Sequence, residues 1–186
     1  MPSPVPSLIA AVLFLSDPVT PPSSPVPGLL SPPAACSSQE YRQFDFWLGD
    51  WAVTNSKGQS AGENHVVAIQ NGCVIQENWI GADGGTGTSF NMFYDGDHRW
   101  HQTWVDARGG RLDLVGGVVG GRMILRGEVA ARGEAGRKIL HQITWEKHGD
   151  TQVRQLWQSS GNGGETWTVV FDGTYARKSA AGTAAR

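Results

Sequence analysis

The stretch that decides the fold reads Phe44-Asp45-Phe46-Trp47-Leu48-Gly49-Asp50-Trp51. It carries two of the chain's eight tryptophans and separates a proline-rich leader from a body rich in strand-forming residues. Gly49 allows a tight turn into a first strand. Trp51 is large enough to close the end of a small barrel, because the interior of such a barrel must be filled by side chains. The apolar run before them predicts a lid across that end, folded as one short helical turn.

Behind this stretch, short runs of β-branched and aromatic residues alternate with turn sequences such as Asn71-Gly72, Asp95-Gly96-Asp97 and Gly120-Gly121. The predicted strands cover 50–55, 64–70, 73–80, 87–94, 98–106, 111–118, 121–130, 138–147, 151–159 and 165–175. Connections this short permit only antiparallel hairpins. About ten antiparallel strands with no helix to cover a face should close on themselves. The sequence therefore predicts an all-β fold, a single closed antiparallel up-and-down barrel, with a sandwich as the competitor.

Composition and charge exclude several classes of function. The net charge of −2 supplies no basic field for nucleic acid or for an anionic membrane surface. The five histidines show no metal-ligand spacing, and the sequence has no nucleophile elbow and no phosphate-binding loop. We therefore expect no nucleic-acid partner, no metal and no cofactor.

The leader, residues 1–43, contains all ten prolines of the chain and is not expected to fold, whereas 178–186 form a short flexible tail. Within the leader, the apolar run Leu8 to Leu15 has the length of the apolar part of a signal peptide and is too short to span a bilayer as a helix. Pro33-Ala34-Ala35-Cys36 is similar to a bacterial lipoprotein cleavage box, which makes Cys36 a candidate lipid anchor. The leader thus predicts export to the periplasm, secretion or lipid anchoring. A mis-called start codon is the alternative and would leave the protein cytoplasmic.

Two cysteines, Cys36 and Cys73, are too few for a disulfide framework or a structural zinc site. A bridge between them stays open. The favoured interpretation makes Cys73 a small buried apolar residue in a strand.

Alternation along the strands predicts which side chains face inward, since neighbours on a strand point to opposite faces. The bulky sets are Cys73, Ile75, Glu77 and Trp79; Trp100, Gln102 and Trp104; Ile139, His141, Ile143 and Trp145; Val153, Gln155 and Trp157; and Trp167, Val169, Phe171 and Tyr175. From these sets the candidate ligand-binding residues are Glu77, Trp79, Trp100, Gln102, Trp104, His141, Trp145, Gln155 and Trp157.

The polar members of this aromatic interior need partners, because a buried polar group without one costs free energy. Glu77, Gln102 and Gln155 could pair with one another in a network that fixes strand register, which describes a barrel with a filled core. They could instead orient a ligand inside a cavity with aromatic walls. In a third interpretation Glu77 is a general acid or base whose pKa is raised by its apolar surroundings.

Several motifs together resemble a bacterial family of uncharacterised lipocalin-like (calycin-type) domains over residues 44–177. They are the opening Phe44 to Trp51 stretch, Gly72-Cys73-x-Ile75-x-Glu77-x-Trp79, Trp100-x-Gln102-x-Trp104-Val105-Asp106, Val153-Arg154-Gln155-x-Trp157 and Gly164-x-Thr166-Trp167 with Phe171-Asp172-Gly173-x-Tyr175. The resemblance implies a calycin-type barrel, often behind an export signal, with no established activity or cofactor. Nitrobindin-like haem barrels are more distant relations that bind haem through a histidine near the chain end. This sequence has no histidine after His148, so no haem is expected.

The function predicted from the sequence is non-enzymatic binding of a small, largely apolar or amphipathic ligand inside the barrel. The main alternative is an isomerase or cyclase with Glu77 as acid or base. A structural, envelope-associated domain with a filled core is the third. The expected assembly state is a monomer or a homodimer without a transmembrane segment.

Overall fold

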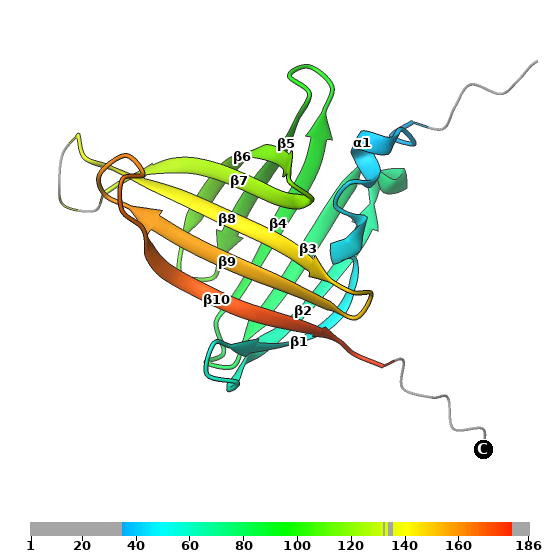
Figure 1. Cartoon of the computed structure of the whole chain (residues 1–186), viewed down its shortest axis with the longest axis horizontal. Helices are drawn as coiled ribbons and strands as arrows, with labels where there is room; N and C mark the ends of the chain where they lie inside the picture. Colours follow the sequence, from blue (N-terminus) through cyan, green and yellow to red (C-terminus); the bar gives the residue numbers. More distant parts are fainter. Residues whose placement is uncertain (1–34, 132, 134–135, 180–186) are drawn as a thin grey trace, which may run out of the picture. The chain divides into compact units, whose positions relative to one another are not determined.

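The computed structural model describes residues 35–131, 133 and 136–179, which form a closed barrel of antiparallel strands (Figure 1). The strands are β1 (Gly49–Asn55), β2 (Ser60–Ile69), β3 (Val74–Gly81), β4 (Thr86–Tyr94), β5 (Arg99–Asp106), β6 (Arg111–Val119), β7 (Arg122–Ala130), β8 (Lys138–His148), β9 (Gln152–Ser160) and β10 (Thr168–Arg177). Each strand pairs with its neighbours in sequence, and β1 closes the barrel against β10. The predicted all-β up-and-down barrel of ten strands is confirmed.

Two strands, β2 and β10, begin three or more residues from their predicted starts, because side chains control the turns before them. β2 begins at Ser60 rather than 64. The side-chain oxygen of Asn55 accepts the backbone N–H groups of Lys57 and Gln59, which completes the turn at once. β10 begins at Thr168 rather than 165, since Asn162 still accepts the backbone N–H of Thr166 within the preceding loop.

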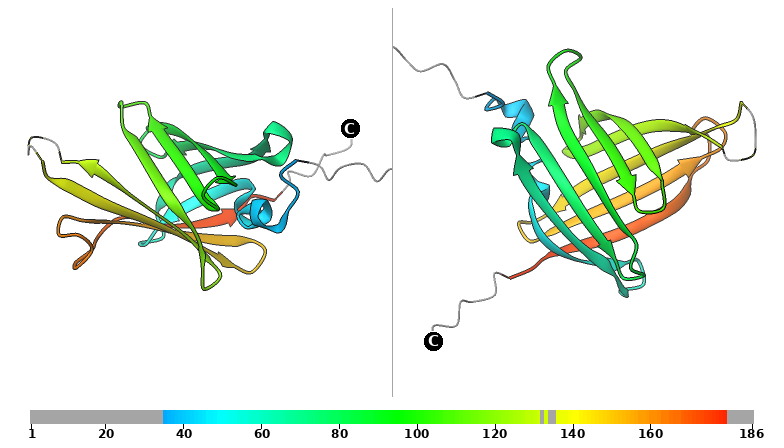
Figure 2. Two further views of the ribbon diagram at one scale, coloured as in Figure 1. Left: turned by 90° about the horizontal axis from the view of Figure 1, so that it is seen from above. Right: turned by 180° about the vertical axis from the view of Figure 1, so that it is seen from behind.

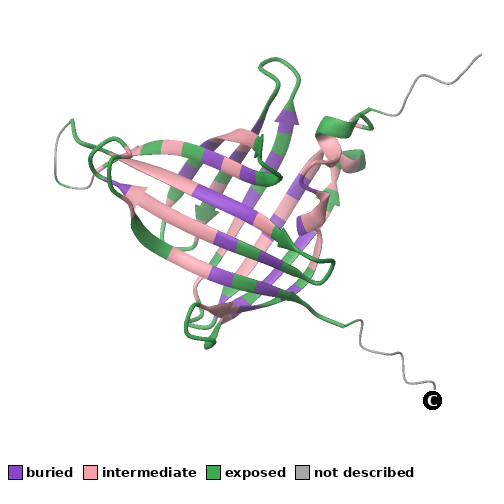
Figure 3. Ribbon diagram, in the orientation of Figure 1, coloured by how far each residue is buried: buried purple, intermediate pink, exposed green. Residues whose placement is uncertain are grey.

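Burial alternates along the strands, as Figure 3 shows. Two residues predicted to face inward, Cys73 and Trp167, lie outside the strands, and the ring of Trp167 lies 6.0 Å from the guanidinium of the exposed Arg126. On the strands themselves the predicted inward sets are inward with one exception, on β10. Val169 pairs with Gln158 and Phe171 pairs with Trp157, so a β-bulge inserts Val170 between them. The extra residue shifts the alternation by one position. Val169, predicted to face inward, therefore points outward with 55 % of its surface exposed.

A short N-terminal segment plugs one end of the barrel, beside the connection between β2 and β3 (Figure 2). It contains α1 (Gln39–Arg42) and the 3-10 turn η1 (Asp45–Trp47). The ring of Phe44 stacks on Trp47 at a centroid distance of 4.9 Å and meets Trp145 edge-on at 5.1 Å. The indole N–H of Trp51 donates to the carbonyl of Trp47 at 2.9 Å. The predicted lid, with its single helical turn, is present.

The backbone conformation of residue 49 requires glycine, and a side chain there would also displace a neighbouring arginine. The φ of Gly49, +136°, lies in the region that side chains rarely adopt. An added Cβ would lie 2.1 Å from the guanidinium of Arg177, which itself stacks over the ring of Trp51 at 4.4 Å. The turn into β1 and the closing tryptophan thus depend on the same glycine.

Residues that the sequence assigns to the leader contact the barrel from Cys36 onward. Cys36 forms a disulfide with Cys73, which ends the 3-10 turn η2 (Gln70–Gly72) instead of lying buried in a strand. The ring of Tyr41 packs on Phe93 at 5.3 Å, and Gln43 accepts a hydrogen bond from the indole of Trp100 at 3.1 Å. The interpretation of Cys73 as a small buried apolar residue is therefore wrong.

The apolar run at 8–15 and the residues 33–34 of the proposed cleavage box lie outside the described residues. Within the part that the structure describes, no helix has the length and apolar character needed to cross a bilayer.

Candidate functional site

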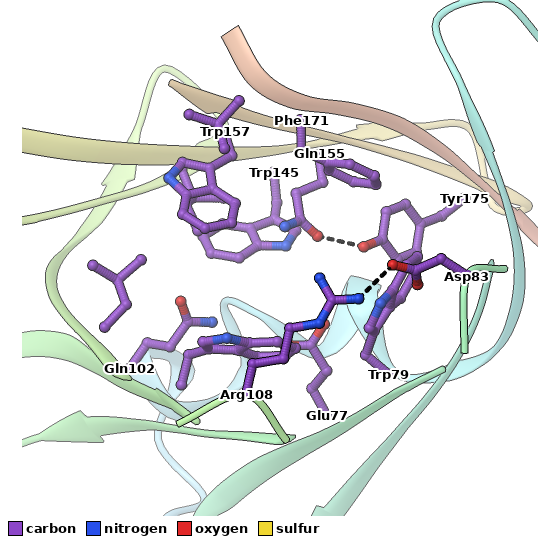
Figure 4. Close-up of a pocket in the computed structure, with 14 residues that line it drawn as sticks. Glu77, Trp79, Asp83, Gln102, Arg108, Trp145, Gln155, Trp157, Phe171 and Tyr175 are labelled. Carbon is purple, nitrogen blue, oxygen red and sulfur yellow. Dashed lines mark hydrogen bonds and ion pairs between the residues drawn. The ribbon is translucent and has the colours of Figure 1, made fainter. Parts of the chain in front are cut away.

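A cavity of about 440 Å³ occupies the half of the barrel opposite the plug (Figure 4). Its mouth lies between the β3–β4 and β5–β6 turns, which contribute Asp83 and Arg108. Trp145 is its floor, because the other side of this indole contacts Phe44 and Trp47 of the plug. The lining consists of Glu77, Trp79, Asp83, Gln102, Trp104, Arg108, Leu112, Ile143, Trp145, Gln155, Trp157, Val170, Phe171 and Tyr175.

Glycines on neighbouring strands make room for the aromatic walls. An added Cβ on Gly87 of β4 would lie 2.2 Å from the ring of Trp104, so this indole lies directly over the β4 backbone. An added Cβ on Gly62 of β2 would lie 2.9 Å from the ring of Trp79. The large side chains can therefore lie against the wall, which leaves the centre of the barrel hollow.

Glu77 is the buried carboxylate of the cavity, with 4 % of its surface exposed. Asn64 of β2 donates its side-chain N–H to one carboxylate oxygen at 2.7 Å, and the hydroxyl of Ser89 on β4 donates to the other at 2.7 Å. Burial raises the pKa of Glu77 to about 7, against the opposing effect of these two hydrogen bonds. The carboxyl group therefore changes charge near neutral pH.

Gln102 belongs to the same network through Asn91. Its amide nitrogen donates to the side-chain oxygen of Asn91 at 2.7 Å. Asn91 in turn donates to the backbone carbonyl of Ile75 at 3.1 Å and to the hydroxyl of Ser89 at 2.9 Å. The amide oxygen of Gln102 is buried and accepts no hydrogen bond.

Gln155 has a separate partner on the other side of the cavity. Its amide oxygen accepts a hydrogen bond from the hydroxyl of Tyr175 on β10 (Figure 4). Burial, and then the nearby Glu77, raise the pKa of Tyr175 well above its usual value, so the phenol stays neutral. The indole N–H of Trp145 is buried without an acceptor. Mutual pairing of Glu77, Gln102 and Gln155 was one of the open alternatives; the structure instead divides them between two networks.

The mouth carries an exposed ion pair. Arg108 donates to Asp83 across the two turns at 2.8 Å, with side-chain exposures of 74 % and 64 %. The backbone N–H of Gly85, and then Arg108, lower the pKa of Asp83 below its usual value. This pair is neutral as a unit and leaves the charge of Glu77 uncompensated.

Seven of the nine predicted site residues line the cavity: Glu77, Trp79, Gln102, Trp104, Trp145, Gln155 and Trp157. Trp100 does not, because it faces the plug, where it contacts Phe44 at 5.6 Å. His141 of β8 does not line the cavity either: its Nδ1 accepts the indole N–H of Trp157 at 2.9 Å, and burial lowers the pKa of His141. His141 thereby orients one wall of the cavity without lining it.

The sequence reasoning missed the polar partners Asn64, Ser89 and Asn91, although all three occupy inward positions of their strands. The alternation of the strands would have identified these three residues as inward-facing if small polar residues, and not only bulky ones, had been considered as site candidates. Tyr175 was expected to face inward but was not assigned to the site. Asp83 and Arg108 carry no sequence signal, since only the closing of the barrel brings their turns together.

Chemically, the site offers aromatic surface, one carboxylate that titrates near neutrality and an unused hydrogen-bond acceptor. Among the residues that the structure describes, no group of three or more potential metal ligands gathers anywhere. Comparison with models of known protein families and with curated protein sequences gave no match.

Proposed function

We propose that this barrel is a non-enzymatic binding protein for a small, largely apolar molecule held in the cavity opposite the plug. The observation that carries the proposal is the hollow itself. A barrel evolved only for a packed core would fill this volume, as it does at the plugged end, since interiors pack densely. The cavity of about 440 Å³ falls within the range of ligand pockets.

The lining supports an apolar ligand with a flat or slender body. Trp79 meets Phe171 edge-on at 6.0 Å, and Trp157 is held by its hydrogen bond to His141. Aromatic walls already fixed in place bind apolar surface without a further ordering cost.

We also propose that the protein is exported and that it belongs to the lipocalin-like family that its motifs resemble. The Cys36–Cys73 disulfide supports an oxidising compartment such as the periplasm. Lipid attachment at Cys36 is not part of this proposal, because the sulfur is bonded to Cys73.

One observation favours a second function. A carboxyl group with a pKa of about 7 inside an apolar cavity has the properties of a general acid or base. An isomerase or cyclase that uses Glu77 is therefore the alternative proposal. It requires turnover of a bound ligand, whereas carriage requires only binding.

The binding function is tested with Trp104→Ala and the matched control Phe90→Ala. Phe90 is an aromatic residue on β4 that points outward with 47 % exposure. Removing the Trp104 wall should weaken binding of amphipathic aromatic probes about tenfold, the equivalent of about 1.4 kcal/mol. Phe90→Ala should leave the affinity unchanged. The measurement is isothermal titration calorimetry, with native mass spectrometry for co-purifying ligands. Wild-type protein that binds no probe and carries no ligand would overturn the proposal.

A further inference from the structure

We propose that the ligand is an organic ammonium ion, a protonated primary or secondary amine on an apolar body, whose N–H groups bind Glu77 and Gln102. The inference rests on the proposed binding function and assigns the chemistry of the ligand's head group. It follows from the direction of each hydrogen bond, from the charges around the cavity and from the aromatic walls.

The first step begins at a backbone carbonyl, which can only accept. Asn91 donates to the carbonyl of Ile75, so the amide nitrogen of Asn91 must point there and its oxygen must point to Gln102. Gln102 is then obliged to donate with its own nitrogen. Its amide oxygen faces away from this network, without a donor. In Figure 4 that oxygen points toward the side on which Trp157 lies.

The same chain of bonds sets the role of Glu77. The Ser89 hydroxyl accepts from Asn91, so its single proton goes to Glu77. Asn64 donates to the second carboxylate oxygen. Both oxygens are therefore acceptors, as in an ionised carboxylate. A protonated Glu77 would require the Asn64 amide to turn over and present its oxygen, which has no hydrogen-bond partner.

No positive charge in the described residues balances that carboxylate. The residues facing Glu77 are neutral: Asn64 from β2, Ser89 from β4, Gln102 from β5 and Tyr175 from β10.

Charged and titratable groups farther away do not supply the missing cation. Arg108 at the mouth is paired with Asp83. Across the cavity His141 is held neutral, because burial lowers its pKa and its Nδ1 accepts a hydrogen bond. A buried unpaired carboxylate is costly, and a bound cation would remove that cost.

The walls favour the same class of ligand. Trp79, Trp104 and Trp157 present indole rings to the cavity. The face of an aromatic ring attracts a cation, most strongly for tryptophan and in a desolvated site. A neutral ligand gains the apolar contact and, if it carries an O–H, one uncharged hydrogen bond. An ammonium group gains the ring attraction, the carboxylate and the unused acceptor of Gln102.

Binding should be linked to proton release. The pKa of Glu77 is about 7 in the free protein, and a bound cation lowers it. Below pH 7 a proton must leave before the cation binds, so affinity falls by up to about tenfold per pH unit. Alkylamines stay protonated below about pH 10, so the ligand itself does not titrate in this range.

The test uses isothermal titration calorimetry to compare three probes that share a naphthylethyl body and differ in the head group. They are 2-(1-naphthyl)ethylamine, its N,N,N-trimethyl derivative and the neutral 2-(1-naphthyl)ethanol. At pH 8 the primary amine should bind at least about tenfold more tightly than the alcohol, as expected for hydrogen bonds to a charged group. The trimethyl derivative should bind more weakly than the primary amine, since it has the charge but no N–H. At pH 5.5 the preference for the amine should disappear, while the alcohol binds equally at both values.

Glu77→Gln supplies the matched variant. Its amide can accept from Ser89 and donate to Asn64 after that amide turns, so the fold should survive, as checked by near-ultraviolet circular dichroism. Amine affinity should fall to that of the alcohol, and alcohol affinity should not change. If the variant fails to fold, the wild-type pH series still decides. An alcohol that binds as tightly as the amine at pH 8 overturns the ammonium proposal and leaves the binding function standing. Absence of binding by all three probes overturns both.

Discussion

The two ends of this barrel are built from the same ten strands, but one end is filled by side chains and the other encloses a cavity. At the plugged end Trp47, Trp51 and Trp100 are each exposed by 1 % or less. At the other end Trp79, Trp104 and Trp157 line a cavity and are only partly buried. The indoles of Trp51 and Trp100 donate to Trp47 and to Gln43, both from the N-terminal segment.

The difference teaches that the strands alone do not decide whether a barrel is filled. Alternation sends tryptophans inward at both ends. The N-terminal segment from Cys36 to Leu48 then covers one end with its own aromatic rings. In the part of the chain that the structure describes, the opposite end has only turns and an exposed ion pair. Stability is therefore expected to concentrate at the plug, and binding at the open end.

The largest expected effect comes from truncating one tryptophan at each end. Trp51→Ala should cost about 3–5 kcal/mol of unfolding free energy, as large aromatic truncations in cores do. Trp104→Ala should cost under about 2 kcal/mol, because its ring already borders a cavity. Urea unfolding of both variants measures the contrast. Equal costs would mean that the two ends are packed alike and would break the comparison.

The next effect concerns the covalent tie of the plug. The disulfide joins residues 37 apart in sequence, and removing a bridge of this kind typically costs about 2–4 kcal/mol. The double change Cys36→Ser with Cys73→Ser should destabilise the protein by that amount. It should leave ligand affinity at the open end unchanged. A loss of affinity without a loss of stability would show that the plug controls the cavity and not the fold.

The smallest effect is a pH-dependent one at the cavity. The pKa of Glu77 is raised from 4.5 to about 7, so the folded state binds this proton more tightly than the unfolded state. The resulting stabilisation is present below pH 4.5 and is lost as the pH rises through 7. Glutamine does not titrate, so Glu77→Gln does not lose this stabilisation. Between pH 5 and pH 8 the free energy of unfolding of the variant should therefore rise by about 1–3 kcal/mol relative to that of the wild type.

Chemical unfolding at the two pH values measures this gain. Glu165→Gln, in the exposed turn before β10, is the control and should show no such difference. A Glu77 variant that tracks the wild type at both values would show that the carboxyl group is not desolvated.

Most of the fold could be predicted from local patterns, because alternation, turn residues and strand propensity act over a few residues. Local patterns predicted the ten strands, the glycine at position 49 in the turn into the first strand, and the inward position of seven site residues. The prediction that Val169 faces inward was wrong, because a β-bulge shifts the two-residue alternation of β10 by one position. No local sequence signal marks that bulge.

The sequence by itself thus determined the barrel, its aromatic interior and the presence of a carboxylate inside it. Only the tertiary structure decided that Cys36 bonds to Cys73, that Trp100 belongs to the plug and that Gln102 and Gln155 have different partners. The physical reason is distance along the chain. These contacts join residues 11 to 57 positions apart. Their geometry depends on strand register and closure, which no local sequence pattern carries.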